Sequence, residues 1–185
     1  NYTYNDLNGH TTLIARAANM AAQKGIAVVV AAGNEGSSAW HYITTPADAD
    51  SIISVGAVDK NRKVASFSSF GPGSNGHIKP DIAAIGSGAV VANTATGQPM
   101  YGNGTSFACP IMAGITTCLW QAFPEVNNMV IIDALRQSSD RVSNPDNRTG
   151  YGIPDVKKAF VALQKKLYTQ QIAIDDNCKT MIRWT

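Results

Sequence analysis

Ile26-Ala27-Val28-Val29-Val30-Ala31-Ala32 is the stretch that decides the fold, and Gly33-Asn34-Glu35-Gly36 follows it directly. The run is apolar throughout, rich in β-branched residues, and has the length of a strand. Strands that are covered on one face alternate apolar with polar residues, whereas parallel strands covered on both faces are continuously apolar. The stretch therefore predicts a buried parallel strand that ends in a turn.

Predicted helices and strands alternate on both sides of this run. We expect the following elements: a helix from Leu13, capped by Thr11 or Thr12 and ended by Gly25; strands over 51–58 and 82–85, with a short extended piece over 64–70; and helices opening at Thr105, at Asn127 or Asn128, and at Pro154-Asp155. This alternation predicts an α/β fold with a mostly parallel sheet flanked by helices.

Composition narrows the class of protein. The 185 residues fit one compact domain, and 44% hydrophobic with 15% charged residues excludes a disordered chain. A net charge of +2 gives no basis for nucleic acid as a partner. No apolar run approaches the roughly 18 residues of a membrane span, and the residues given contain no signal-peptide pattern, which says nothing about the compartment.

The three cysteines predict no disulfide framework. Cys109 and Cys118 are nine residues apart on one predicted helix, which places them on opposite faces and excludes a bond between them. We expect buried, inert thiols. The cysteine and histidine spacing matches no zinc motif, and no cofactor is expected.

A second motif, Gly104-Thr105-Ser106-Phe107-Ala108-Cys109-Pro110, opens a helix that carries hardly any charge. Such a helix is expected to be buried on most sides. Thr105 suits the N-cap position, and Pro110 falls near the first turn. Ser106 then lies at the positive end of the helix dipole, where an attacked carbonyl oxygen would be stabilised. The alternative is that Thr105 and Ser106 only cap the helix.

Asn34 follows the buried strand, at the strand end where open α/β sheets bind ligands. Its side-chain amide could donate a hydrogen bond to an oxyanion. The alternatives are a turn asparagine in a left-handed conformation and a phosphate-binding loop, for which no Gly-Lys-Ser/Thr is present.

Taken together, the two motifs resemble those of the subtilisin-like serine proteases (subtilases), and the resemblance covers about residues 11 to 165. Supporting pieces occur in the family's order: Thr45-Pro46-Ala47, Ser54-Val55-Gly56-Ala57-Val58, Phe67-Ser68-Ser69-Phe70-Gly71-Pro72 and Lys79-Pro80-Asp81-Ile82. The resemblance implies a subtilisin-like fold that is incomplete, with its N-terminal strands absent.

The resemblance also implies roles for individual residues. Ser106 corresponds to the acylating nucleophile, and Asn34 to the side chain of the oxyanion hole, joined by the Ser106 N–H and the Thr105 hydroxyl. Residues 31–33 (Ala31, Ala32 and Gly33) correspond to the strand that lines the primary specificity pocket, and Thr105 joins them as a substrate-binding residue. The Thr45–Pro46 bond is expected to be cis.

The Asp and His that precede Ser in the family's triad have no counterpart here. His10 only weakly mimics the family's Gly-His-Gly-Thr context, and His41 and His77 lie in loops without a matching context. Because a Ser hydroxyl without a general base is a poor nucleophile, this chain alone is expected to be inactive. The expected function is a serine endopeptidase completed by an upstream segment. The alternative is a non-catalytic binding or packing module.

Residues 1–168 are accordingly expected to form the C-terminal half of a catalytic domain, followed by a tail over 169–185 in which Gln171–Asp175 could be a strand. The strand over 26–32 should lack a sheet neighbour. Its edge is expected to be covered by the upstream half of the domain or by self-association. A peptide or protein is the expected substrate, and the full-length protein is expected to be secreted, periplasmic or at the cell surface.

Two further features receive no functional role. Asp48 and Asp50 could contribute to a calcium site, but loop aspartates are more often turn caps, and no metal is assigned. Asn103 and Asn147 lie in glycosylation patterns, and the first overlaps the serine motif, where a glycan would block substrate.

Overall fold

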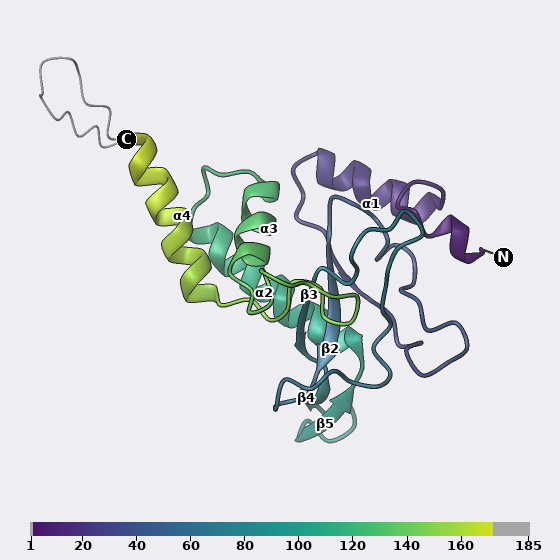
Figure 1. Cartoon of the computed structure of the whole chain (residues 1–185). Coiled ribbons are helices and arrows are strands. Elements are labelled where there is room, and N and C mark those ends of the chain that lie inside the picture. Colours follow the sequence, from purple (N-terminus) through teal and green to yellow (C-terminus); the bar gives the residue numbers. More distant parts are fainter. Residues whose placement is uncertain (1, 172–185) are drawn as a thin grey trace, which may run out of the picture.

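A parallel sheet lies between layers of helices in the computed structural model of the chain, which describes residues 2–171 (Figure 1). The sheet consists of β1 (Val29–Ala31), β2 (Ile53–Val58) and β3 (Ile82–Ile85), in the order β1-β2-β3. All neighbours are parallel, with Val30 opposite Ser54 and Ala57 opposite Ala84. The predicted α/β class is confirmed.

Helix α1 (Leu13–Gln23) covers one face of the sheet. The N-cap is Thr12, whose hydroxyl accepts from the Ala15 N–H at 3.1 Å, as one of the two predicted caps. Ala15 is fully buried and packs with Ile52, Val28 and Val30. Small residues thus let the helix approach the sheet closely.

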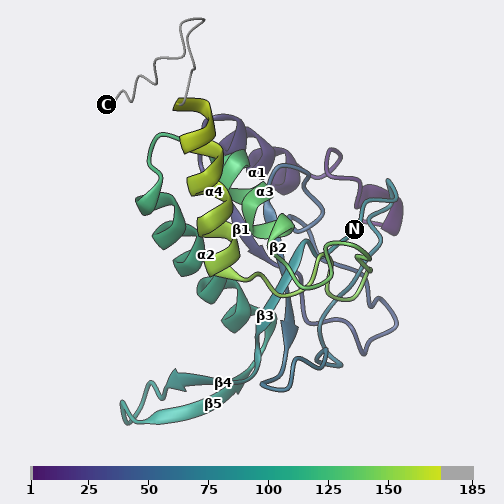
Figure 2. The ribbon, with the colours of Figure 1, turned by 60° about the vertical axis from the view of Figure 1, so that its left-hand side comes forward.

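Helix α2 (Thr105–Ala122) lies against the opposite face and contacts all three strands (Figure 2). Helices α3 (Asn128–Gln137) and α4 (Val156–Gln171) pack against α2 and against each other. The main core joins these layers, and its largest fully buried side chains are Ile53, Ile82, Met112, Leu119, Ile131, Ile132, Leu135 and Val55. Asn127 caps α3, as predicted.

The strands differ in length from their predictions. The run over 26–32 forms strand only at 29–31, the next strand begins at Ile53, and β3 matches its predicted range. The piece over 64–70 forms only isolated bridges, of which one joins Val64 to Val58. Two elements were not predicted: η1 (Tyr4–Asp6), and the antiparallel hairpin of β4 (Ser87–Ala92) and β5 (Pro99–Asn103), which projects from the body in Figure 2.

Helix α2 corrects three expectations. Its N-cap is Gly104, with φ 156°, and Thr105 is the first helical residue. Pro110 lies inside the helix, beyond the first turn. The helix is not buried on most sides, because its outward half is exposed; Cys118 lies there as an exposed free thiol, and Cys109 is a half-buried one.

Other predictions concern the loops and the C-terminal end. The Thr45–Pro46 bond is cis, as expected, and so are Gly71–Pro72 and Lys79–Pro80. Helix α4 runs to Gln171, across the boundary expected after residue 168. Gln171, where the expected strand over 171–175 begins, is the last residue of α4, and residues 172–175 lie outside the described residues. Within the described part of the chain, no helix is long and apolar enough to span a bilayer.

Candidate active site

Two strand ends bring the predicted site residues together. Strand β1 ends at Ala31, and the chain turns through Gly33 to place Asn34 on the surface. Strand β5 leads into Gly104, whose N–H donates to the Gly86 carbonyl at 2.8 Å. Ser106 follows in the first turn of α2 and is also exposed.

Asn34 is held by the start of α2. Its Oδ1 accepts hydrogen bonds from the Thr105 backbone N–H at 2.9 Å and from the Thr105 hydroxyl at 3.0 Å. The Gly33 N–H donates to the same hydroxyl at 3.3 Å. Because the carboxamide oxygen faces Thr105, the Nδ2 amide of Asn34 is left to face outward.

Two hydrogen-bond donors flank Gly104. A β-carbon placed on Gly104 would lie 3.7 Å from the Ser106 backbone nitrogen and 3.8 Å from Asn34 Nδ2. These donors come from segments about seventy residues apart in the sequence, and Ser106 itself is exposed. Paired donors in this arrangement suit a developing negative charge on a carbonyl oxygen.

Thr105 lies in the interior, next to Asn34. The residue is 0% exposed, and its single hydroxyl proton is donated to Asn34. It lies beneath Asn34 and orients that side chain, without a surface for substrate. Ala32 is likewise fully buried, whereas Ala31 and Gly33 are half-buried.

The Ser106 hydroxyl has no hydrogen-bond partner among residues 2–171. The His10 Nε2 lies 2.8 Å from the Asp50 carboxylate, and the His77 Nδ1 lies 3.2 Å from it. Asp50 precedes β2, at the amino end of the parallel sheet, whereas Asn34 follows β1 at its carboxyl end. His41 is stacked on Phe70 with ring centroids 5.0 Å apart.

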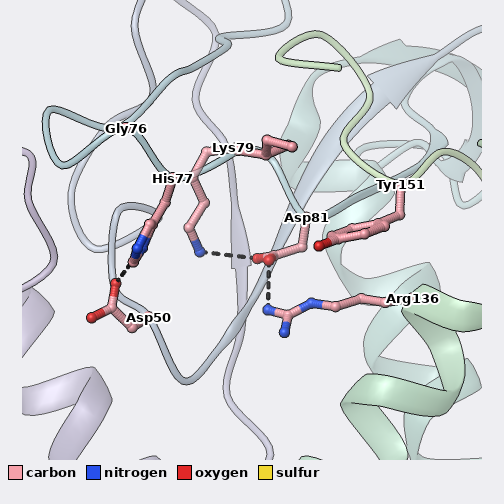
Figure 3. A pocket seen from close by; sticks show the side chains of 8 residues that line it. Asp50, Gly76, His77, Lys79, Asp81, Arg136 and Tyr151 are labelled. Atoms are coloured by element: carbon pink, nitrogen blue, oxygen red, sulfur yellow. Dashed lines mark hydrogen bonds and ion pairs between the residues drawn. The ribbon is translucent and has the colours of Figure 1, made fainter. Parts of the chain in front are cut away.

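A buried charge network lies at the amino end of the sheet and was missed by the sequence analysis (Figure 3). The Asp81 carboxylate accepts from Lys79 Nζ at 3.0 Å, from Arg136 Nη2 at 2.5 Å and from the Ser54 hydroxyl at 2.6 Å. Lys79 Nζ also donates to the Ala49 carbonyl at 2.7 Å. The network borders a cavity of about 390 Å³ whose far wall includes His77.

Burial alone would raise the pKa of Asp81, but the opposing effects are larger. The Lys79 and Arg136 cations and the two Ser54 hydrogen bonds hold the pKa of this carboxyl below its usual range. The network therefore joins β2, β3 and α3 around an ionised carboxylate. Its only sequence signal was the Lys79-Pro80-Asp81 motif, because Arg136 lies 55 residues away.

The aspartates considered for calcium lie near Gly9. Asp48 Oδ2 accepts from the Gly9 N–H at 2.9 Å, and its buried Oδ1 has no partner. Asp50 pairs with the two histidines. Within residues 2–171, no group of three or more His, Cys, Asp or Glu side chains is arranged to hold a metal ion.

Comparison with known proteins assigns the class. The model of the subtilase family (Peptidase_S8) matches residues 2–152. The chain therefore belongs to the subtilase family, and the resemblance drawn from its motifs is confirmed.

Curated relatives and solved structures agree with this assignment. The chain is 37% identical over 144 residues to "Thermophilic serine proteinase" of Bacillus sp. (strain AK1), which covers 77% of this chain and 33% of that protein. It is 33% identical over 136 residues to "Subtilisin DY" of Bacillus licheniformis, covering 72% and 47%. The chain thus spans a third to about half of these relatives.

Two solved structures show the same fold. The self-cleaved protease domain of PatA superposes with a TM-score of 0.67 at 27% identity, covering 81% of this chain and 54% of that one. The PatG macrocyclase in complex with peptide gives a TM-score of 0.67 at 26% identity, covering 80% and 46%. The predicted subtilisin-like fold is therefore confirmed.

Proposed function

We propose that this chain is the C-terminal part, over residues 1–168, of a serine endopeptidase that hydrolyses peptide bonds through an acyl-enzyme on Ser106. Family membership supports the reaction class. One observation carries the assignment of residues: Asn34 Nδ2 and the Ser106 backbone nitrogen both lie beside Gly104, and Ser106 is exposed.

In the proposed reaction, Ser106 Oγ attacks the scissile carbonyl and forms a tetrahedral intermediate. Its oxyanion lies between the Ser106 N–H and Asn34 Nδ2, and the peptide C–N bond then breaks as the amine leaves. An imidazole oriented by a carboxylate, from a polypeptide segment outside this chain, takes the hydroxyl proton and delivers it to the amine. Thr105 keeps the Asn34 oxygen turned inward, and Ala31 and Gly33 face the substrate.

A chimera tests this function. The upstream segment comes from the thermophilic serine proteinase of Bacillus sp. (strain AK1), here called the AK1 proteinase. We fuse the part of it that precedes the stretch similar to this chain ahead of residue 1, and we measure hydrolysis of a chromogenic peptide. We expect turnover that Ser106→Ala abolishes. A folded chimera that keeps the parent rate after this substitution would contradict the assignment of the nucleophile.

A non-catalytic binding module is the second candidate, and one observation favours it. The Ser106 hydroxyl has no base among the described residues, so the isolated chain should not hydrolyse peptides. We propose an extracytoplasmic location for the full-length protein, supported only by its resemblance to the family.

A further inference from the structure

The cavity of about 390 Å³ beside the Asp81 network is separate from the candidate active site (Figure 3). It lies at the amino end of the sheet, where Asp50 precedes β2, whereas Asn34 follows β1 at the carboxyl end. Its walls come from the loops before β2 and β3, from the end of α3 and from the loop after α3. Ligand pockets range from about 300 to 1,000 Å³, so the cavity has room for a small organic molecule.

The Asp81 carboxylate offers nothing to a ligand in this cavity, because the network already uses both of its oxygens. Its Oδ2 accepts from the Ser54 N–H at 2.7 Å, from the Ser54 hydroxyl at 2.6 Å and from Lys79 Nζ at 3.0 Å. Its Oδ1 accepts from Arg136 Nη2 at 2.5 Å, and the side chain is only 5% exposed. A cation entering the cavity would therefore meet two positive groups and no free carboxylate oxygen of Asp81.

Hydrogen-bond donors, in contrast, are left over. Arg136 uses only its Nη2, which donates to Asp81 and to the Ile52 carbonyl. Its Nε is buried without a partner, and its Nη1 has no partner within residues 2–171. The Tyr151 hydroxyl has none in the same part of the chain either. Figure 3 shows the guanidinium and the phenol hydroxyl both directed toward Asp81 at the cavity wall.

The charges on the cavity wall favour an anion. Lys79 and Arg136 bring two positive charges against the single negative charge of Asp81, which leaves an excess of one positive charge. Lys79 is 3% exposed, so Arg136, at 21%, presents this excess to the cavity. Across the cavity, the Asp50 carboxylate is occupied by His10 Nε2 at 2.8 Å and His77 Nδ1 at 3.2 Å.

We propose that this cavity binds a carboxylate, held by the Arg136 guanidinium and the Tyr151 hydroxyl. A guanidinium with free N–H groups forms strong charge-assisted hydrogen bonds to carboxylates. The single excess charge matches a monoanion better than a phosphate dianion. Ile78, which is half-buried on the same wall, provides apolar contact for the carbon part of the ligand. Small organic acids and peptide C-termini both carry this group.

Titration followed by NMR tests the site in the 185-residue chain. The probes are benzoate and benzamide, which have nearly the same shape but differ in charge, added at neutral pH and at constant ionic strength to keep general screening fixed. We expect benzoate to shift the Arg136 Nε–Hε resonance along a saturable curve. Benzamide should bind at least tenfold more weakly, because it cannot form the charge-assisted pair.

Two tyrosine variants provide a matched comparison. Tyr151→Phe removes the hydroxyl and keeps the ring, and it should weaken benzoate binding at least threefold. Tyr101→Phe, at a position on β5 that is 78% exposed, should leave binding unchanged. Neither substitution should lower the urea concentration at the midpoint of unfolding, because the Tyr151 hydroxyl has no partner within residues 2–171.

The outcomes separate the site from its ligand. Equal affinity for benzoate and benzamide, an Arg136 resonance that does not move, or equal binding by wild type and Tyr151→Phe would overturn the site. Tighter binding of inorganic phosphate than of benzoate would overturn the choice of a carboxylate. Displacement of benzoate by N-acetyl-alanyl-alanine would support the site and assign it to peptide C-termini, whereas benzoate binding without such displacement would support a site for small acids.

Discussion

At the scale of single residues, Asn34 connects the two halves of the candidate site. Its oxygen accepts hydrogen bonds from the backbone N–H and the hydroxyl of Thr105, and its nitrogen lies beside Gly104, as does the Ser106 backbone nitrogen. A side chain held on one end by two hydrogen bonds needs little reorganisation when charge develops at the other end. Such preorganised donors are a large contribution to catalysis of acyl transfer.

We therefore expect Asn34→Ala in the active chimera to lower kcat by about a hundred- to thousand-fold, the known loss for such a donor in subtilisin. KM should change little, because the donor acts on charge that is absent in the bound substrate. Steady-state kinetics with a peptide substrate measure both constants. Ser37→Ala, at an exposed position in the following loop, is the control. A loss below tenfold would remove Asn34 from the mechanism.

Thr105 is a positioning residue, and its substitutions separate orientation from packing. Thr105→Val keeps the shape but removes the hydroxyl that donates to Asn34, and Thr105→Ser restores it. We expect the valine variant to lose kcat with KM nearly unchanged and the serine variant to recover most of the rate. Equal rates for both variants would show that the hydroxyl does not orient Asn34.

At the scale of elements, the Asp81 network fastens α3 to the starts of β2 and β3. Arg136 reaches from α3 to the Asp81 carboxylate and to the Ile52 carbonyl at 3.2 Å. Removing one partner of such a buried group leaves the other charges uncompensated. Asp81→Asn should therefore lower the free energy of unfolding by about 3–5 kcal/mol at neutral pH. Asp133→Asn, at an exposed site on α3, should change it little.

The same carboxylate predicts a pH dependence. Because the folded pKa of Asp81 lies below its unfolded value, its contribution is complete above the unfolded pKa of about 3.9 and is lost as pH falls through the folded value. Urea unfolding across a pH series should show the gap between wild type and Asp81→Asn narrowing only below about pH 4. A gap that is constant down to the acid limit would contradict the pairing.

Two glycines in left-handed conformations allow a matched test of the loop that covers β3. Gly150 has φ 64°, and an added β-carbon would strike the carbonyl oxygens of Pro80 and Asp81. Gly25 has φ 88° and open space around it. Gly25→Ala should cost about 1–2 kcal/mol of unfolding free energy from backbone strain alone, and Gly150→Ala clearly more. Urea unfolding of both variants measures these losses in unfolding free energy. Equal losses would mean that the loop moves to accommodate the β-carbon at residue 150 without a further loss of stability.

At the scale of the whole molecule, the sequence predicted the positions of Asn34 and Ser106 better than the elements around them. Continuous apolar runs and the placement of Asn34 and Ser106 at element ends depend on local pattern, so they were predictable. The β4–β5 hairpin lacks a clear alternation, and the Asp81 network depends on Arg136, far along the chain. The lack of charge in α2 predicted a helix buried on most sides, because sequence pattern does not show which faces of a helix other elements cover.

The open flank beside β1 explains that last difference. Within residues 2–171, the outer edge of β1 has no strand beside it, large apolar side chains of α1 and α2 are exposed, and the Ser106 hydroxyl has no base. Under the proposed function, one upstream segment would pair this edge, cover these helices and supply the proton acceptor together. Stability and activity of this chain are therefore expected to rise together when its partner segment binds.

Active-site labelling tests this account most directly. The chain is treated with a fluorophosphonate, alone and with the AK1 upstream segment, and the modified residue is identified by peptide mass mapping. The account predicts no labelling of the chain alone and labelling at Ser106 in the mixture. Rapid labelling of Ser106 in the isolated chain, or labelling of the mixture at another residue of this chain, would contradict it.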